Sequence, residues 1–211
     1  MAKFRLFGEP GWGSVIVEAQ LEWYGLEFEF ERVGDLFESA EAREKLEKIN
    51  PLAQVPTLLL PDGTVMTESA AITLLLADMT GENSLVPAPG DASRAAFLRW
   101  LVFIVANVYP TYTYGDDPAR FVPVDSAQKP FEDTVLAYAR KLYEQLEDVA
   151  SAPWFLGERF SAIDIYICAM TRWQPKRQWF AEHAPKLHAI AEAAQEQEKL
   201  RPVWARNLLT N

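Results

Sequence analysis

Two side chains near residue 70 have the types and spacing to bind the head group of an amino acid. In the run TES, Glu68 and Ser69 stand directly before a helical pattern that includes Ile72. The free N–H groups of a helix N-terminus bind carboxylates, and a glutamate beside them accepts hydrogen bonds from an ammonium group. An ordinary helix start, with Ser69 as its cap and Glu68 solvated, explains each residue when it is taken alone.

A second segment, QVPTLLL, places Pro56 directly before a predicted strand at 57–60. Proline cannot donate to a strand ladder, so it suits a sheet edge or a bend, and the Val55–Pro56 bond is a candidate for the cis form. Such a bend leaves the backbone N–H and C=O of Val55 free to dock an extended peptide. Together with Glu68 and Ser69, this edge predicts a receptor for a small charged peptide.

The third segment is GEPGWGS, residues 8–14, which joins a strand-like run to a helix-like run. Ser14 directly precedes the apolar pattern of Val15 and Leu21, where serine is a preferred N-cap. Its hydroxyl, or the backbone N–H groups after Gly11, can also stabilise a thiolate. Capping and chemistry are compatible, and the sequence leaves both roles open.

The elements that must position these segments alternate between strand and helix periods. We expect strands at 3–7, 28–30, 57–60 and 64–67, and helices at 14–24, at 41–50 and from residue 69. The PDG run at 61–63 supplies a hairpin turn. The order β-α-β-α-β-β-α predicts a thioredoxin-like α/β domain over residues 1–80.

The rest of the chain has no convincing strand pattern. GENSLVPAPG at 81–90 reads as a linker, and 91–211 as an all-helical bundle domain. Three apolar helical faces support the bundle, and a solvated helix is expected at 185–200. The faces are Phe97, Trp100, Leu101, Ile104, Val105 and Val108; Phe131, Val135, Tyr138 and Leu142; and Ile163, Tyr166, Ile167 and Met170.

Composition excludes several classes of function. Thirty acidic against twenty basic residues give a formal charge of −10, which disfavours nucleic acid and membrane surfaces as partners. The single Cys168 excludes an internal disulfide and a paired-cysteine redox site, and we expect it to be buried. His183 and His188 do not share a helical face, so we expect no metal. The N-terminal residues lack a signal-peptide pattern, and we expect a cytoplasmic protein.

The three motifs NPLAQVPTL, DGTVMTESAAI and FLGERFSAIDIYI, in this order, resemble the cytosolic-type glutathione S-transferases, in particular bacterial members. The resemblance covers nearly the whole chain. It implies that glutathione is the co-substrate, that Val55 binds its cysteinyl backbone and that Pro56 is cis. It further implies that Glu68 and Ser69 hold the γ-glutamyl group and that Gln54 contacts the glycyl end. Ser161 and Asp164 match the family's capping box, a structural pair.

The resemblance also implies a function and an assembly. The activity would be conjugation of the glutathione thiolate to hydrophobic electrophiles, a detoxification reaction, in a homodimer. The helical domain would form the second-substrate pocket, with Trp12, Tyr109 and Tyr112 as candidates, although ordinary packing explains these aromatic residues equally well.

The sequence departs from the family at the position of the thiol activator. Where relatives carry serine, tyrosine or cysteine, this chain has Gly11, Trp12 and Gly13, so Ser14 is the only local hydroxyl and our candidate catalytic residue. The departure leaves two alternatives open: a weakly active or non-catalytic glutathione-binding or protein-interaction relative, or a glutathione-dependent peroxidase or isomerase. A disulfide oxidoreductase is disfavoured because residues 1–80 contain no cysteine.

Overall fold

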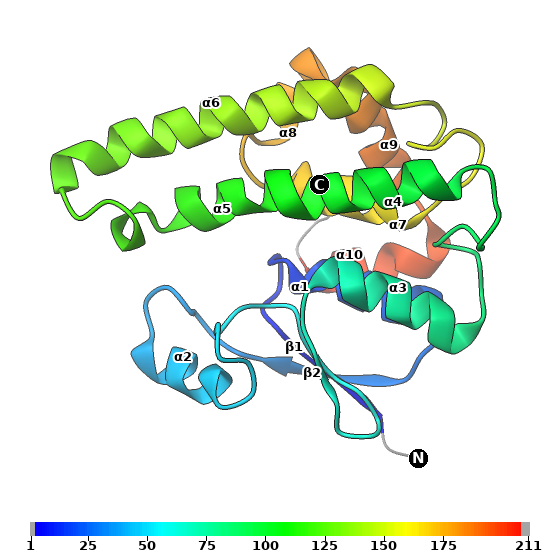
Figure 1. The fold of residues 1–211 in the computed structure, drawn as a ribbon, viewed down its shortest axis with the longest axis horizontal. Helices are drawn as coiled ribbons and strands as arrows, with labels where there is room; N and C mark the ends of the chain where they lie inside the picture. Colours follow the sequence, from blue (N-terminus) through cyan, green and yellow to red (C-terminus); the bar gives the residue numbers. More distant parts are fainter. Residues whose placement is uncertain (1–2, 208–211) are drawn as a thin grey trace. The chain divides into compact units, whose positions relative to one another are not determined.

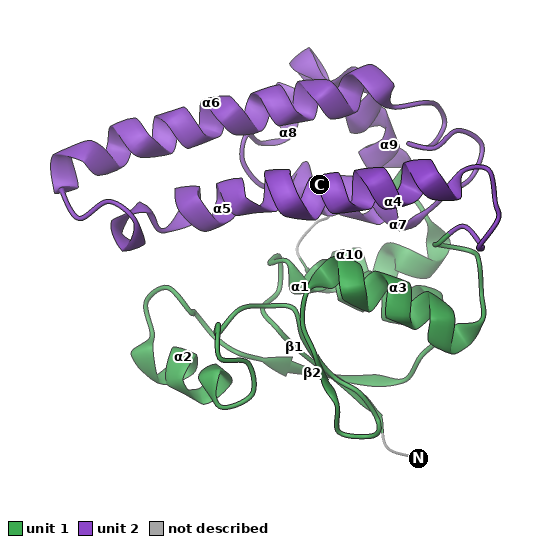
Figure 2. Ribbon diagram, viewed as in Figure 1, with its two compact units in different colours: residues 1–86, 194–211 green, residues 87–193 purple. Residues whose placement is uncertain are grey.

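The computed structural model describes residues 3–207, which divide into two compact units (Figures 1 and 2). Unit 1 contains residues 1–86 and 194–211, and unit 2 contains residues 87–193. This division differs from the predicted one mainly at the C-terminus, because the segment from 194 returns to unit 1. Residues 208–211, which we assigned to the helical domain, lie outside the described residues.

Unit 1 is built on a four-stranded mixed sheet in the order β2-β1-β3-β4. The strands are β1 (Phe4–Gly8), β2 (Phe28–Arg32), β3 (Thr57–Leu59) and β4 (Val65–Met66). β1 pairs parallel with β2 and antiparallel with β3, and β3 pairs antiparallel with β4. The PDG run closes the β3–β4 hairpin as predicted, with Gly63 N–H donating to the Leu60 carbonyl at 2.9 Å.

Four α-helices surround this sheet: α1 (Ser14–Trp23), α2 (Ala40–Glu47), α3 (Ser69–Thr80) and, from the C-terminal segment, α10 (Arg201–Arg206). A short 3-10 helix, η3 (Glu198–Leu200), leads into α10. α1 lies between these elements and contacts β1, α3, η3 and α10. Its residues from Ser14 to Leu21 are all buried, so α1 is the central helix of unit 1.

Unit 2 is all-helical within the described residues, as predicted. Its helices are α4 (Arg94–Phe103), α5 (Tyr109–Asp116), α6 (Asp125–Val149), α7 (Ala162–Met170), α8 (Arg177–His183) and most of α9 (Pro185–Gln195). A π-helical segment, η1 (Ile104–Val108), joins α4 to α5, and a 3-10 turn, η2 (Pro118–Arg120), follows α5. α6 runs alongside α5 (Figure 1).

The π-helical segment has a cause in the sequence. Pro110 has no N–H, so the carbonyl of Ala106 lacks the donor that a regular helix provides four residues later. The Tyr109 N–H instead bonds to the Ile104 carbonyl five residues back. The π turn therefore lets one long helical run pass through the proline.

α7 is the core of unit 2, since all nine of its residues are buried. The predicted capping box is present at its start: the Ser161 N–H and Oγ donate to Asp164 Oδ2 at 2.7 and 3.0 Å. Asp164 Oδ1 also accepts from the Phe155 N–H at 2.8 Å. Cys168 is 1% exposed, and burial raises the pKa of its thiol to about 12, which confirms a packing role.

Two expectations for the helices need correction. Tyr138, which we placed on the apolar face of α6, is 52% exposed, so that face is narrower than its periodicity predicted. The solvated helix at 185–200 ends at Gln195, and buried residues such as Leu187 and Ile190 line one side of it.

The run Arg94–Asp116 has the length and mean hydropathy, 1.2, of a membrane-spanning helix. Core helices of globular proteins have the same property. Phe97, Leu101, Ile104 and Val108 on this run are buried within the protein. Other residues of the run, such as Val102, are exposed.

Candidate functional site

The strand registers bring the three predicted segments to one end of the sheet. Thr57 pairs with Phe7 across β1 and β3, and Leu58 pairs with Met66 across β3 and β4. Antiparallel registers continue residue by residue. Extended beyond the strands, they set Pro56 opposite both Gly8 and Glu68. The loop after β1, the bend before β3 and the start of α3 therefore meet.

The bend at Val55 is held by Asn50, a residue that we did not single out from the sequence. Asn50 is 4% exposed, and its Nδ2 donates to the Gln54 carbonyl and to Thr57 Oγ1, both at 3.0 Å. Thr57 Oγ1 in turn donates to the Gln54 carbonyl at 2.8 Å. The signal available in the sequence was an asparagine before proline, which is typical of a turn.

The Val55–Pro56 bond is cis, in agreement with the prediction. Gln54 is exposed, Val55 is half-buried and Pro56 is buried. Among the described residues, neither the N–H nor the C=O of Val55 has a hydrogen-bond partner. An unpaired backbone donor and acceptor on one residue can add a strand-like peptide.

Glu68 begins α3 in a backbone conformation that is rare for its residue type. Its φ of 61° lies in the left-handed region, which costs free energy in any residue other than glycine. The Glu68 side chain is exposed, and among the described residues it accepts only a long hydrogen bond, 3.4 Å, from Thr67 Oγ1. A strained backbone that exposes a carboxylate at a helix N-terminus is typical of a ligand site.

Ser69 does not cap α3, so the alternative of an ordinary capping serine does not hold. Glu68 occupies the N-cap position without a side-chain hydrogen bond, and Ser69 is the first helical residue, 6% exposed. Within residues 3–207, the N–H groups of Ser69 and Ala70 have no acceptor. The N-terminus of α3 thus retains the free donors that an anionic group needs.

Ser14 does not cap α1 either. Gly13 is the N-cap, and Ser14 is the first residue of the helix. The Ser14 side chain turns back and donates from Oγ to the Glu9 carbonyl at 3.2 Å, and the residue is 0% exposed. Gly8 leaves the room for it, because a Cβ on Gly8 would lie 2.3 Å from Ser14 Oγ. The Ser14 hydroxyl therefore stabilises the loop after β1 through a buried hydrogen bond to the backbone of Glu9.

Glu9 organises the loop after β1, and no pattern in the sequence pointed to this residue. Its carbonyl accepts from Ser14 Oγ and from the Trp12 N–H at 3.1 Å. Its side chain accepts from Arg32 Nε at 3.0 Å and from the Gly34 N–H at 3.1 Å, at the end of β2. Arg32 and Gly34 lie 23 or more residues from Glu9 along the chain, so it is the parallel β1–β2 pairing that brings them to its side chain.

Within the described residues, two amides at the N-terminus of α1 have no acceptor, those of Gly13 and Ser14. The Gly11 N–H donates to Asn207 Oδ1 at 3.0 Å and the Trp12 N–H to Glu9. The Gly13 N–H has no acceptor in the described part of the chain. Gly13 is half-buried, unlike Ser14, and so its N–H is the better placed of the two to reach a ligand anion.

Trp12 and Val55 share a small hydrophobic cluster on this side of unit 1. Its buried centre is Phe7, Leu36 and Leu46, and both Trp12 and Val55 pack against it. Trp12 also contacts Phe37, with ring centroids 5.1 Å apart. The cluster fixes the loop after β1 relative to the peptide-docking edge.

Tyr109 and Tyr112 belong to an aromatic cluster inside unit 2. Both rings stand edge-on to Trp173, at 5.9 and 5.1 Å, and Tyr112 shares a hydrogen bond with Tyr143. The Tyr109 hydroxyl is buried without a hydrogen-bond partner. Burial raises the pKa of both hydroxyls well above its ordinary value, so at neutral pH they are protonated hydrogen-bond donors.

The fold and the site together define a thioredoxin-fold protein with an added helical unit and no cysteine in the loop after β1. Residues 15–79 match the family model described as the glutathione S-transferase N-terminal domain. The uncharacterized GST-like protein YncG of Escherichia coli K12 is 39% identical over 96% of this chain and 98% of its own length. The chain belongs to the glutathione S-transferase family.

Two further relatives agree with this assignment. Glutathione S-transferase GstA of Escherichia coli O157:H7 is 30% identical over 80% of this chain and 81% of its own length. The crystal structure of a glutathione transferase homologue from Sulfitobacter, with bound glutathione, shares the fold at a TM-score of 0.84. That homologue is 22% identical, and the match covers 97% of this chain and 98% of its own length.

Proposed function

We propose that the protein is a glutathione transferase that conjugates the glutathione thiolate to hydrophobic electrophiles. The observation that carries the proposal is the meeting, at one end of the sheet, of Val55, Glu68 and the N-terminus of α1. Bound glutathione in the Sulfitobacter homologue supports the same ligand here. In the conjugation the sulfur forms a bond to an electrophilic carbon, and the leaving group departs with its electron pair.

Each part of glutathione has a complementary group in unit 1. The N–H and C=O of Val55 pair with the cysteinyl backbone in the manner of an added strand. The γ-glutamyl carboxylate accepts from the free N–H groups of Ser69 and Ala70, and its ammonium donates to Glu68. Gln54, which is exposed beside the bend, is assigned to the glycyl end.

The thiolate is stabilised by the N-terminus of α1 rather than by a dedicated side chain. A helix N-terminus carries partial positive charge, which lowers the pKa of a nearby thiol. The unengaged Gly13 N–H supplies the hydrogen bond, while the buried Ser14 hydroxyl is committed to Glu9. We therefore assign the activation to the Gly13 amide in preference to our first candidate, Ser14.

The same observation favours one alternative, a glutathione-binding relative with little turnover. A backbone amide alone is a weaker activator than an amide together with a hydroxyl, because each charge-directed hydrogen bond adds to the shift of the thiol pKa. Conjugation, peroxide reduction and isomerisation all start from the same thiolate. The roles of Trp12, Tyr109 and Tyr112 in electrophile binding, the homodimer, the detoxification role and the cytoplasmic location remain predictions.

The deciding experiment is a pH titration of the bound glutathione thiol by ultraviolet difference absorbance. The natural protein is compared with Ser14→Ala and with Thr80→Ala, a hydroxyl deletion at the opposite end of α3. We expect a depressed thiol pKa in all three proteins. Turnover is then assayed with activated aryl halides, isothiocyanates and peroxides.

If the thiol pKa returned to its free value only in Ser14→Ala, the Ser14 hydroxyl and not the Gly13 amide would be the group that activates the thiol. Tight glutathione binding with an unshifted thiol and no turnover would instead identify a binding protein.

A further inference from the structure

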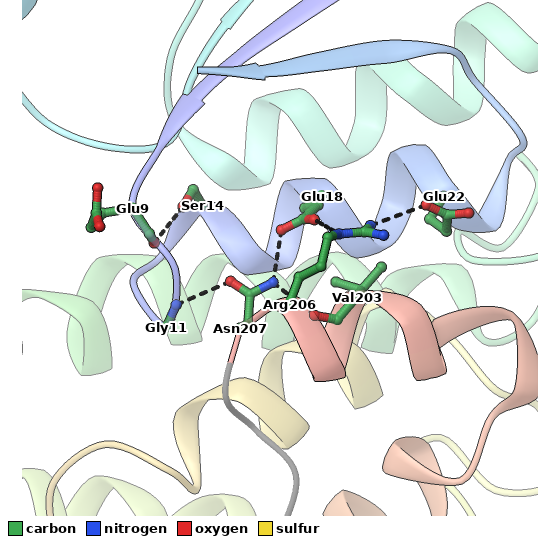
Figure 3. Close-up of polar contacts among 8 residues, drawn as sticks. All are labelled: Glu9, Gly11, Ser14, Glu18, Glu22, Val203, Arg206 and Asn207. Carbon is green, nitrogen blue, oxygen red and sulfur yellow. Dashed lines mark hydrogen bonds and ion pairs between the residues drawn. The ribbon is translucent and has the colours of Figure 1, made fainter. Parts of the chain in front are cut away.

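The loop that carries the Gly13 amide is held by a residue from the far end of the chain (Figure 3). Asn207 follows α10, and its Oδ1 accepts from the Gly11 N–H at 3.0 Å. Its Nδ2 donates to Glu18 Oε2 and to the Val203 carbonyl, both at 2.8 Å. Because one amide oxygen faces a donor and the amide nitrogen faces two acceptors, the side chain has one allowed orientation.

Glu18 is the second member of this arrangement. It lies one turn after Ser14 in α1 and is 2% exposed, which is rare for a glutamate. One oxygen of its carboxylate accepts from Arg206 Nε at 2.8 Å, at the end of α10, and the other accepts from Asn207 Nδ2. A buried carboxylate with both oxygens engaged holds its partners firmly. Removal of either partner would leave a buried charge without compensation, which costs free energy.

The Gly11 amide is the point at which this arrangement reaches the loop. Gly11 has φ +82°, a conformation that favours glycine, and a Cβ there would lie 3.6 Å from the Asn207 carbonyl. Two residues further along the chain is the Gly13 N–H. The bond to Asn207 on one side and the bonds to Glu9 on the other therefore set where that N–H points.

We infer that Asn207 and Glu18 are positioning residues, which hold the loop after β1 so that the Gly13 amide meets the glutathione sulfur. The inference rests on the proposed function. Neither residue touches the ligand, and both act through the Gly11 backbone. A shift of about 1 Å in a reacting group costs on the order of a hundredfold in rate, so the fastening of a loop can matter as much as its chemistry.

The test compares three variants of the full-length chain. Asn207→Ala removes the acceptor of the Gly11 N–H. Glu22→Gln is the matched control, because it removes the charge from the exposed 3.2 Å bond from Arg206 Nη2 at the same junction and leaves Glu18 and Gly11 untouched. The exchange Asn207→Asp with Glu18→Gln keeps an acceptor for Gly11 and reverses the donor and acceptor between positions 18 and 207. It gives up the bond to the Val203 carbonyl, because a carboxylate has no hydrogen to donate.

We expect Asn207→Ala to raise the thiol pKa of bound glutathione and to lower kcat about tenfold or more. The Kd for glutathione should change less than about threefold, because Val55 and Glu68 are untouched. Glu22→Gln should match the natural protein. The paired exchange should recover part of the kcat that Asn207→Ala loses, a rescue that a general loss of stability does not produce.

Three outcomes overturn the inference. In the first outcome, Asn207→Ala has the same thiol pKa and the same kcat as the natural protein. In the second, the activity of Asn207→Ala falls only in proportion to its folded fraction, measured by near-ultraviolet circular dichroism. If Asn207→Ala does not fold, Asn207→Asp alone is compared with the paired exchange. The third outcome is then an equal kcat and an equal thiol pKa in these two variants. An unshifted thiol in the natural protein would instead overturn the proposed function, and the positioning role with it.

Discussion

At the scale of the residue, the site depends on backbone groups more than on side chains. In the proposed glutathione site, Val55 would contribute its N–H and C=O, Gly13 its N–H, and Glu68 a charged side chain. Backbone groups carry no residue identity, so a sequence reveals them only through the turns around them. Glu68 differs, because its side chain is the relevant group. Its φ of 61° is a conformation that glycine would adopt more easily, so the glutamate occupies this position at a cost in backbone strain.

The prediction for Glu68 separates binding from stability. Glu68→Gln removes the charge opposite the ligand ammonium and should raise the Kd for glutathione about tenfold, since a charged hydrogen bond contributes about 1.5–3 kcal/mol. Isothermal titration calorimetry measures it, with the exposed Glu27→Gln as control. Glu68→Gly should be more stable to urea than Glu68→Ala by about 1 kcal/mol, because φ is positive.

An unchanged Kd in Glu68→Gln would remove Glu68 from the ligand site. If Glu68→Ala were the more stable of the two truncations, the backbone strain at this position would be refuted.

At the scale of the element, the helix starts at the candidate site differ from the start of α7. α1 and α3 begin without side-chain cap hydrogen bonds. α7 begins with a complete capping box whose carboxylate is fully buried. A helix start in a core needs internal partners for its donors, whereas under the proposed function the starts of α1 and α3 keep donors for glutathione.

The buried capping box makes a prediction about pH. Burial raises the pKa of Asp164 to about 6, above its unfolded value of 3.8. Between these values the folded chain holds a proton that the unfolded chain has released, so the contribution of Asp164 to stability decreases as pH rises from 4 to 6. The natural protein should lose about 2–3 kcal/mol of unfolding free energy relative to Asp164→Asn across this range.

Urea denaturation of both proteins at several pH values measures the difference, and the other carboxylates cancel because both chains share them. Asp125→Asn, an exposed change at the start of α6, is the control for the substitution itself. A difference that is constant with pH, or that grows in favour of the natural protein, would contradict the raised pKa of Asp164.

At the scale of the whole molecule, the chain's last described segment belongs to its first unit. Leu200, Val203 and Trp204 are buried at 1% exposure or less, and α10 contacts α1. Unit 1 is therefore completed by residues that the sequence order assigned to the helical domain. The arrangement links the C-terminal segment to the loop after β1 through Asn207 and Glu18.

A test of this arrangement is Trp204→Ala. Trp204 is among the largest fully buried side chains, and its Nε1 donates to the Ala194 carbonyl at 3.3 Å. Removing a buried tryptophan costs about 3–5 kcal/mol. Urea denaturation should show this loss, and the exposed Tyr138→Ala should cost less than about 1 kcal/mol. A cost as small as that of Tyr138→Ala would mean that the segment is not part of the core of unit 1.

The sequence by itself determined the fold class, the hairpin, the capping box and the segments of the candidate site. These features are local: alternation, turn residues and short motifs lie within about ten residues of one another along the chain. It left open whether Ser14 and Ser69 cap their helices, because a serine before a helix has the same pattern whether its side chain turns forward or back.

Only the tertiary structure decided which groups are free and which are engaged. Glu9 with Arg32, Gly11 with Asn207, and Glu18 with Arg206 join residues 23 to 196 positions apart. No local pattern encodes such pairs, because hydrogen-bond partners are chosen by the packing of whole elements. The proposed activating role thus moved from the Ser14 hydroxyl, visible in the sequence, to the Gly13 amide, which is selected only once the hydrogen bonds and burial of the neighbouring groups are known.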